Sequence, residues 1–239
     1  MMIKIEKVSK SYKNVVALDE VSLTVEDNSM FALLGFNGAG KSTLINIICS
    51  LIKKDAGKVW VNDLDLDSSV NDIRQIVGLM PQENAIANNL TVAENLAFMA
   101  DLYGVENSSV LVDELLNKLS LTSKKNARAK QLSGGQKRRL NLGMALISKP
   151  KVLILDEPTL GLDVKSRRDL WEIVQKYKQK NTVLFTTHYL EEAEKYADRI
   201  GIIKSGKIVI CGTKDEIIAK AKTDSFENAF LKYAGGEDE

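Results

Sequence analysis

The sequence is poor in the residues that mark secreted, zinc-binding or membrane-spanning proteins. Its 239 residues include two cysteines, Cys49 and Cys211, and one histidine, which fit neither a disulfide framework nor a zinc site. No apolar run approaches the roughly 20 residues that cross a bilayer, and the N-terminus lacks a signal-peptide pattern. We therefore expect free thiols in a reducing cytosol. If the protein works at a membrane, another subunit must anchor it.

The sequence also lacks a charge excess. Its 33 Lys and Arg residues nearly balance its 32 Asp and Glu residues, and the net charge is +1. This balance removes the electrostatic case for nucleic acid as the main partner. The composition is that of a globular protein, with 44% hydrophobic residues and no low-complexity tract. The length allows one large domain, or one domain with an inserted lobe.

A glycine-rich stretch, Gly35–Thr43, reads GFNGAGKST and matches the phosphate-binding pattern G-x-x-x-x-G-K-[ST]. The apolar run Met30–Leu34 predicts a buried strand before it, and an apolar helix is expected after it. Gly38 and Gly40 allow backbone conformations that turn successive N–H groups into one concavity. The start of the helix adds its partial positive charge. This local order predicts a phosphate site.

Two side chains of the stretch suit a nucleoside triphosphate. Lys41 would bring a full positive charge to the β- and γ-phosphates, and Ser42 would bring a hydroxyl to Mg²⁺. The alternative is a glycine-rich turn that joins a strand to a helix without any ligand. Strand, lysine and serine in register favour the nucleotide site over that alternative.

A second helix start, Leu132–Gln136 with the sequence LSGGQ, has the same chemistry. Ser133 and two glycines at a helix N-terminus present a hydroxyl, exposed N–H groups and a positive dipole end. The alternative is a simple N-cap with a flexible lead-in. Two phosphate-seeking helix starts in one chain suggest that each γ-phosphate is held between two copies. That geometry predicts a symmetric dimer with the nucleotide in its interface.

Acidic and amide side chains follow two predicted buried strands. Val152–Leu155 is the most continuous apolar strand, and it ends in Asp156 and Glu157. Unpaired buried carboxylates are costly, and ligands bind at the carboxyl ends of strands in open α/β sheets. Asp156 is placed to hold Mg²⁺, and Glu157 to polarise the attacking water. Gln82 follows the strand predicted over 76–80, where its amide can reach a metal ion or water.

Three further residues have both a functional and an ordinary interpretation. Asp163 precedes the helix predicted from Val164 to about Lys178 and can be its N-cap. His188 ends the strand predicted over 182–187, where it can hydrogen-bond a γ-phosphate or cap the next helix. Tyr12 is expected in the loop after the first strand, where it can stack on a nucleobase or simply lie at the surface.

The rest of the chain predicts the scaffold. Strands over 3–8 and 21–25 are expected to form an antiparallel sheet. A capping box at Thr91 and apolar spacing over 110–121 predict helices, so residues 83–148 form a predicted helical lobe. The acidic run over 191–195 is interpreted as a solvated helix face. Residues 200–210 predict a hairpin, and residues 235–239 are expected to be disordered.

Together these features resemble the ATP-binding cassette (ABC) ATPase family over nearly the whole chain. Gly35–Thr43 corresponds to the Walker A loop, Leu132–Gln136 to the signature, and Val152–Asp156 to Walker B. The resemblance implies an α/β fold, with a P-loop NTPase (RecA-like) core, an antiparallel β subdomain and an inserted α-helical subdomain. Within one nucleotide-binding domain, the implied segments are 1–82 and 149–225 for the core with the β subdomain, 83–148 for the helical signature subdomain, and 226–239 for the C-terminal helix and tail.

The resemblance also implies a role for single residues, with ATP and Mg²⁺ as cofactors. The implied catalytic residues are Glu157, His188 as the switch, Lys41 and Gln82 of the Q-loop. The implied metal ligands are Ser42, Gln82 and Asp156. The implied nucleotide contacts are Tyr12, Gly35, Phe36, Asn37, Gly38, Ala39, Gly40, Lys41, Ser42, Thr43, Asp163 of the D-loop and, from the other copy, Ser133, Gly134, Gly135 and Gln136.

Within the family the chain is similar to ATPase subunits of ABC-2 type exporters, the drug-resistance and sodium-efflux group. The supporting segments are Leu90–Leu96, Lys137–Leu140, Glu191–Glu194 with Ala197–Ile200, and Phe226–Leu231. The resemblance implies a homodimer, or a heterodimer with a second ABC ATPase. It also implies an integral membrane permease that docks near 82–103, a location on the inner face of the cell membrane, and no nucleic-acid partner.

Two residues differ from those common in the family. Two alternative functions also stay open. Phe36 and Val164 stand where many members have proline, but neither side chain is expected to contact phosphate or water. An import ATPase shares every catalytic motif, although the exporter-like text and the lack of an appended regulatory domain count against it. A soluble ABC protein acting on ribosomes or DNA is the other alternative. Such proteins usually have two cassettes, a basic linker or a long coiled coil, none of which the sequence shows.

Overall fold

The computed structural model describes residues 1–235 and consists of two compact units. Unit 1 contains residues 1–74 and the chain from Thr182 onward, and unit 2 contains residues 75–181. Helix α2 (Val70–Ile76) crosses the boundary between them. Of the tail that was expected to be disordered, residues 236–239 lie outside the described part. Gly235 is described, and its carbonyl accepts a hydrogen bond from Lys204 Nζ at 2.7 Å, so the expectation is wrong there.

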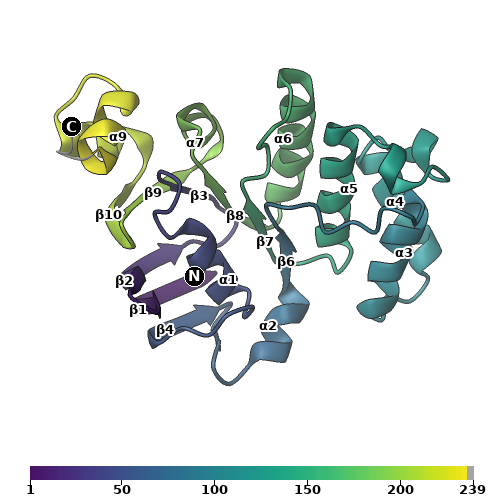
Figure 1. Ribbon diagram of the computed structural model, residues 1–239, viewed down its shortest axis with the longest axis horizontal. Helices are drawn as coiled ribbons and strands as arrows, with labels where there is room; N and C mark the ends of the chain where they lie inside the picture. Colours follow the sequence, from purple (N-terminus) through teal and green to yellow (C-terminus); the bar gives the residue numbers. More distant parts are fainter. Residues whose placement is uncertain (236–239) are drawn as a thin grey trace. The chain divides into compact units, whose positions relative to one another are not determined.

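Unit 1 contains an antiparallel sheet with the order β2 (Val15–Val25), β1 (Ile3–Tyr12), β4 (Ala56–Val61) and β5 (Leu64–Asp65) (Figure 1). Its first strand is half buried, as the alternation of apolar and polar residues predicts. The predicted antiparallel pairing is confirmed, because β1 pairs with both β2 and β4 in that sense. Tyr12 is the last residue of β1 rather than part of a loop, since β1 and β2 continue to a turn of only two residues.

Parallel strands form the buried centre of unit 1. Strand β3 (Met30–Leu34) pairs in parallel with β8 (Thr182–Thr187) and with β9 (Arg199–Lys204), and β10 (Lys207–Gly212) pairs antiparallel to β9. Every residue of β3 and β8 is buried, so neither strand alternates between apolar and polar residues. Strand β3 is apolar throughout, and β8 has an apolar centre between buried threonines. The predicted hairpin of β9 and β10 is confirmed.

Four helices complete unit 1: α1 (Lys41–Ile48), α7 (Leu190–Tyr196), α8 (Lys214–Ala221) and α9 (Phe226–Ala234). Side-chain caps define the starts of the last two helices: Thr213 accepts from Glu216 N, and Ser225 accepts from Asn228 N. Helix α9 packs on α8 and on β9, and α7 contacts β3. The acidic run on α7 is only partly solvated, which corrects the expectation. Glu192 is buried, because its carboxylate accepts from Thr187 Oγ1 at 3.2 Å.

Unit 2 contains two parallel strands, β6 (Val77–Met80) and β7 (Val152–Asp156), in the register Val77–Val152 to Met80–Leu155. Helix α5 (Gly134–Leu146) contacts β6 so closely that a Cβ on Gly78 would lie 2.2 Å from the carbonyl oxygen of Ala145. Helix α6 (Val164–Lys178) follows β7 and contacts α5, with Trp171 fully buried.

The remaining elements of unit 2 are α3 (Val92–Leu102), α4 (Ser108–Lys118) and two short 3₁₀ turns, η1 (Thr122–Lys124) and η2 (Ala129–Gln131). In Figure 1, α3, α4 and α5 lie beside one another. The predicted capping box is confirmed: Glu94 N donates to Thr91 Oγ1 at 3.1 Å, and Thr91 N donates to Glu94 Oε2 at 2.7 Å. The bond from Thr91 N to the carboxylate is the main cause that lowers the pKa of Glu94. The subdomain boundaries at 83 and 148 stay a prediction.

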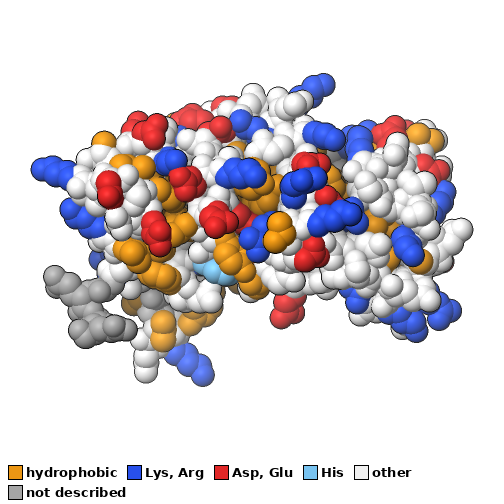
Figure 2. Space-filling model, turned by 90° about the horizontal axis from the view of Figure 1, so that it is seen from above, with side chains coloured by type: hydrophobic (Ala, Val, Ile, Leu, Met, Phe, Trp, Pro, Cys, Tyr) orange, Lys and Arg blue, Asp and Glu red, His pale blue; other side chains and the backbone are white. Residues whose placement is uncertain are grey.

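The surface carries charges of both signs. On the face drawn in Figure 2, basic and acidic side chains occur near one another, in keeping with the net charge of +1. Among residues 1–235 no helix has both the length and the hydropathy needed to cross a membrane.

Candidate nucleotide site

The glycine-rich loop of unit 1 connects buried β3 to α1, as predicted. Gly40 is the N-cap of α1 with φ 107°, and Gly38 has φ 81°. Both values lie in the left-handed region that favours glycine, and a Cβ on Gly40 would also lie 2.6 Å from the carbonyl oxygen of Ala17. The first turn of an α-helix leaves N–H groups without intrahelical partners, so the loop ends in a set of donors suited to an anion.

Lys41 lies inside the same loop. Its side chain is buried, and Nζ donates to the carbonyl oxygens of Gly35 at 2.7 Å and Phe36 at 3.1 Å. The loop's own carbonyls therefore hold the ammonium beside the helix start, although burial of a charge is costly without such partners. Ser42 and Thr43 follow in the first turn of α1 and are half buried. The cradle, the charge and the helix dipole all favour a polyanion here.

A hollow of about 240 Å³ lies against the loop. Its lining joins Phe36–Ala39 to the hairpin of β9 and β10 and to Ala234 of α9. Phe36, half exposed, meets Phe230 of α9 edge to face, with ring centroids 5.2 Å apart. The C-terminal helix thus touches the phosphate loop through an aromatic pair, a contact that the sequence did not predict.

The two other predicted residues of unit 1 lie at strand ends. Tyr12 is exposed at the end of β1, and Lys10 Nζ lies 5.5 Å from its ring centroid. An exposed ring at this place can stack on a base. His188 directly follows β8 and is half buried, with its ring 4.2 Å from that of Tyr189. Tyr189, not His188, is the N-cap residue of α7.

In unit 2, the end of β7 delivers both predicted acids. Asp156 is 6% exposed and Glu157 is 5% exposed. Glu157 has φ 46°, a left-handed conformation that turns the backbone directly after β7. Gln82 lies exposed two residues beyond the end of β6. Because β6 and β7 are parallel neighbours, their carboxyl ends meet at one edge, and Gln82 shares that edge with the two acids.

A buried arginine of α5, Arg138, holds this edge together. Its guanidinium donates to five main-chain carbonyl oxygens, named here the carbonyl cluster. They belong to Pro158 (from Nε, 2.6 Å), Pro81 and Gln82 (from Nη1, 3.0 and 2.7 Å), and Asp156 and Glu157 (from Nη2, 3.1 and 2.6 Å). Burial lowers the pKa of Arg138 to about 10, and the charges of Asp156 and Glu157 oppose that shift. The arginine therefore stays charged at neutral pH.

The signature helix start is intact and partly open to solvent. Gln136 N donates to Ser133 Oγ at 3.3 Å, and Ser133 N donates to Gln136 Oε1 at 3.0 Å, which completes a capping box. The Ser133 hydroxyl therefore acts as the N-cap of α5, as the simpler alternative predicted. Ser133 and Gly134 are exposed, and a Cβ on Gly134 would meet nothing within 4 Å. Gly135 is packed instead: a Cβ there would lie 2.3 Å from Ser166 Oγ.

Asp163 is the N-cap of α6, as one interpretation predicted. Its carboxylate accepts from Ser166 N at 2.9 Å and from Ser166 Oγ at 2.7 Å. The bond from the Ser166 backbone is the main cause that lowers the pKa of Asp163. The residue is exposed, so its position does not conflict with a contact to a second copy.

The two units divide the predicted residues between them. Unit 1 contains the phosphate loop, Tyr12 and His188, whereas unit 2 contains Gln82, the two acids, the signature and Asp163. Within residues 1–235 there is no cluster of three His, Cys, Asp or Glu residues that would hold a metal by itself. The proposed metal ligands are instead a hydroxyl, an amide and a carboxylate, oxygen donors of the kind that Mg²⁺ uses together with phosphate oxygens and water.

Sequence reasoning missed the role of Arg138, although a signal was present. Arg138 is three residues after Gly135, and Leu142 and Ala145 follow at helical spacing, so they share a face. All four are buried. A charged residue on a buried helix face needs partners, and that requirement would have selected Arg138.

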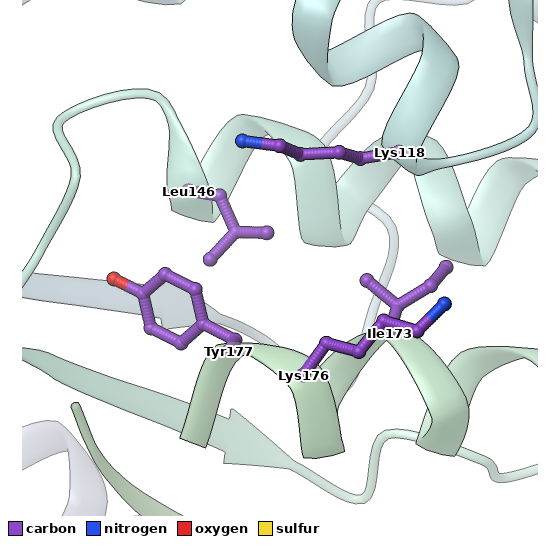
Figure 3. Close-up of a pocket in the computed structure, with 5 residues that line it drawn as sticks. All are labelled: Lys118, Leu146, Ile173, Lys176 and Tyr177. Atoms are coloured by element: carbon purple, nitrogen blue, oxygen red, sulfur yellow. The ribbon is translucent and has the colours of Figure 1, made fainter. Parts of the chain in front are cut away.

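A second hollow, of about 250 Å³, lies in unit 2 and is drawn in Figure 3. Helices α4, α5 and α6 supply its lining: Lys118, Leu146, Ile173, Lys176 and Tyr177. The Tyr177 hydroxyl donates to the carbonyl oxygen of Pro150, and burial raises the pKa of Tyr177. None of the predicted site residues lines this hollow, so it is separate from the nucleotide site.

Comparisons with known proteins agree with this geometry. A family model described as "ABC transporter" matches residues 18–160. The phospholipid-transporting ATPase ABCA3 of Mus musculus is 39% identical over 217 residues, which are 88% of this chain and 13% of that protein. The chain thus spans about 13% of the length of that relative. The linearmycin resistance ATP-binding protein LnrL of Bacillus subtilis is 37% identical over 227 residues, 94% of this chain and 73% of that protein.

Solved structures share the fold. An ATP-binding subunit of an ABC transporter superposes with a TM-score of 0.88 at 28% identity, covering 98% of this chain and 99% of that one. A dimeric ATP-binding cassette in a post-hydrolysis state, with bound ADP and Pi, superposes with a TM-score of 0.81 at 28% identity, covering 89% and 98%. The predicted α/β P-loop NTPase fold, with an antiparallel sheet and added helices, is confirmed.

Proposed function

Because the chain belongs to the ABC transporter family of ATPases, we propose that it binds and hydrolyses ATP to drive a separate transmembrane subunit. The observation that carries the proposal is the phosphate loop, in which Gly40 and buried Lys41 open helix α1. A loop of this kind has little structural reason to bury an ammonium at a helix N-terminus, where the dipole repels it. A bound polyphosphate removes that conflict.

Unit 1 supplies the groups that bind the phosphates and the adenine in this proposal. The loop N–H groups and Lys41 bind the β- and γ-phosphates, and Tyr12 stacks on the adenine. Ser42, Gln82 and Asp156 supply oxygen ligands for Mg²⁺. When bound, Mg-ATP supplies the phosphoanhydride bond and a metal ion that neutralises charge on the transferred phosphoryl group.

Unit 2 supplies the groups for hydrolysis. Glu157 accepts a proton from the attacking water, and His188 of unit 1 orients the γ-phosphate and water by a hydrogen bond. Gln82 positions the same water. The burial of Glu157 directly after β7 supports a catalytic role, since ligands bind at the carboxyl ends of strands in open α/β sheets.

We propose that two copies close head to tail on two nucleotides. The exposed Ser133 and the open space at Gly134 leave an anion site that the chain's own atoms do not fill. In the dimer, the signature of one copy contacts the γ-phosphate held by the loop of the other, and Asp163 lies at the contact. The dimeric cassette relatives support this arrangement.

We propose export as the direction of transport, with the chain held at the inner face of the membrane by its permease. The exporter-like segments of the sequence and the drug-resistance relative LnrL support this. Helix α3 offers exposed Phe98 and Leu102 within the segment proposed to dock on the permease. Co-purification with the neighbouring membrane subunit, followed by transport into inverted vesicles, tests the direction. Uptake into such vesicles is the result expected for an exporter.

The substitution Glu157→Gln tests the catalytic assignment. It keeps the shape of the side chain but removes the base, so turnover should fall at least about 100-fold while ATP binding persists. Glu172→Gln is the matched control, because Glu172 is exposed on α6 and pairs with the exposed Arg168 across one helical turn. Steady-state phosphate release near the parent rate in Glu157→Gln would remove Glu157 from the role of base.

A further inference from the structure

The guanidinium of Arg138 and the carbonyl cluster match one to one. Arginine has five N–H donors in a rigid planar fork, one on Nε and two on each Nη. The five hydrogen bonds use one donor on Nε, two on Nη1 and two on Nη2. No N–H remains to donate to the carboxylate of Asp156 or Glu157. The arginine therefore holds the main chain of this edge rather than the two carboxylates.

The carbonyl cluster exists because the backbone turns at Glu157. Successive carbonyls of an extended strand point in opposite directions, so three in a row do not normally meet one group. The φ of 46° at Glu157 breaks the alternation, and the oxygens of Asp156, Glu157 and Pro158 all reach one guanidinium. Converging carbonyl dipoles repel one another, and the cation offsets that repulsion. The strained conformation of Glu157 thus depends on Arg138.

The same guanidinium also reaches the neighbouring strand. Its Nη1 group holds the carbonyls of Pro81 and Gln82, directly after β6. The main chain at Gln82 and the main chain at the two acids are thereby fixed to one rigid guanidinium. Arg138 lies five residues after Ser133 on α5, about 7.5 Å along the helix axis. The helix that begins with the signature therefore carries the group that holds the acids.

We propose that Arg138 is a positioning residue for ATP hydrolysis, fixing the main chain from which Gln82, Asp156 and Glu157 project and tying it to the signature helix. The inference rests on the proposed ATPase function. Lysine cannot replace arginine here, because its three donors on one nitrogen cannot span five carbonyls in a plane. A misplacement of about 1 Å at a catalytic group can cost about 100-fold in rate. Binding of ATP by the phosphate loop of unit 1 does not require the arginine.

The experiment compares Arg138→Lys and Arg138→Gln with the parent chain and with Arg168→Lys. Arg168 is exposed on α6 of the same unit, and its ion pair with Glu172 at 3.4 Å should tolerate lysine. Steady-state kcat and KM for Mg-ATP are measured, together with ATP affinity in the absence of Mg²⁺ and the circular dichroism spectrum. We expect kcat to fall at least tenfold in Arg138→Lys, with KM and ATP affinity within about twofold, and Arg168→Lys to behave as the parent.

The outcomes separate the two proposals. A parent chain without ATPase activity would count against the proposed function itself. With an active parent, a kcat within about twofold in folded Arg138→Lys would overturn the role of Arg138 alone. Equal losses of ATP affinity and kcat, or loss of the parent spectrum in both variants, would show a general structural role and would overturn positioning too.

Discussion

The phosphate loop of unit 1 and the acidic edge of unit 2 hold their charged groups in different ways. In the loop, Lys41 is held by carbonyls five and six residues away in the sequence. At the edge, Arg138 is held by carbonyls 18 to 57 residues away. The first arrangement is local and can be built by one strand, one turn and one helix. The second exists only after two strands and a helix have packed.

This difference has a functional consequence. A local loop binds its anion wherever the loop itself is folded, so nucleotide binding should survive damage elsewhere. The edge depends on long-range packing, so turnover should be the property that responds to changes in unit 2. Substitutions in the two units should therefore give different kinetic signatures.

The largest effect is expected for Lys41→Ala. The change removes the full charge of the loop, so ATP affinity and turnover should both fall at least about 100-fold, because charge-assisted bonds to phosphate are lost. Equilibrium binding of a fluorescent ATP analogue and phosphate release measure the two quantities. Lys54→Ala is the matched control, since Lys54 pairs with Asp67 outside the loop. Retained ATP affinity in Lys41→Ala would contradict the assignment of the loop.

Substitutions of two adjacent glycines in unit 2, Gly134 and Gly135, should have intermediate effects. They distinguish a loss of packing within the chain from a loss of contact with the second copy. Gly135→Ala places a Cβ against Ser166 and should lower the free energy of unfolding by about 1–3 kcal/mol. Gly134→Ala meets only open space in its own chain, so its stability should stay within about 0.5 kcal/mol of the parent.

The ATPase activity of Gly134→Ala then tests whether a second copy contacts this position. Gly134→Ala should still reduce ATPase activity, because the second copy's nucleotide is proposed to occupy that space. Chemical denaturation and phosphate release are measured on both variants. Full activity in Gly134→Ala would argue against a nucleotide beside Gly134.

The smallest effect is expected at the contact between the loop and the C-terminal helix. Phe36→Ala removes the edge-to-face pair with Phe230 and should lower the free energy of unfolding by about 0.5–1.5 kcal/mol. Phe98→Ala on α3 is the control, because its side chain is exposed to a similar extent, 54% against 50%. Equal losses from the two variants, measured in urea, would mean that the aromatic pair contributes nothing of its own.

The parts of the fold with local causes were predictable from the sequence. Strand β3 is apolar throughout, β7 is apolar up to Asp156, and β8 has an apolar centre. Helices α3 and α6 begin at capping residues that the sequence shows. The phosphate loop was predictable for the same reason, since its motif, its strand and its helix are contiguous. The role of each loop residue in nucleotide binding stays a prediction.

What the sequence did not show depends on tertiary contacts. The acidic run on α7 reads as a solvated face, yet Glu192 is buried because Thr187, at the end of β8, supplies a hydroxyl. Tyr12 was expected in a loop, although β1 continues to it. The pairing of β1 with β2 has register shifts beyond residue 5, and such shifts interrupt the alternation of apolar and polar residues that marks a strand in the sequence. The partners of Arg138 come from three segments, which no local pattern identifies.

The central claim is that each nucleotide site is completed by a second copy of the chain. The most direct test mixes Lys41→Ala chains, which lack a working loop, with Ser133→Arg chains, which lack a working signature. Each mixed dimer contains one site with both parts intact, so phosphate release should recover in the mixture while each variant alone stays inactive. A mixture as inactive as its components, at concentrations where ATP-dependent dimers form, would contradict the shared site.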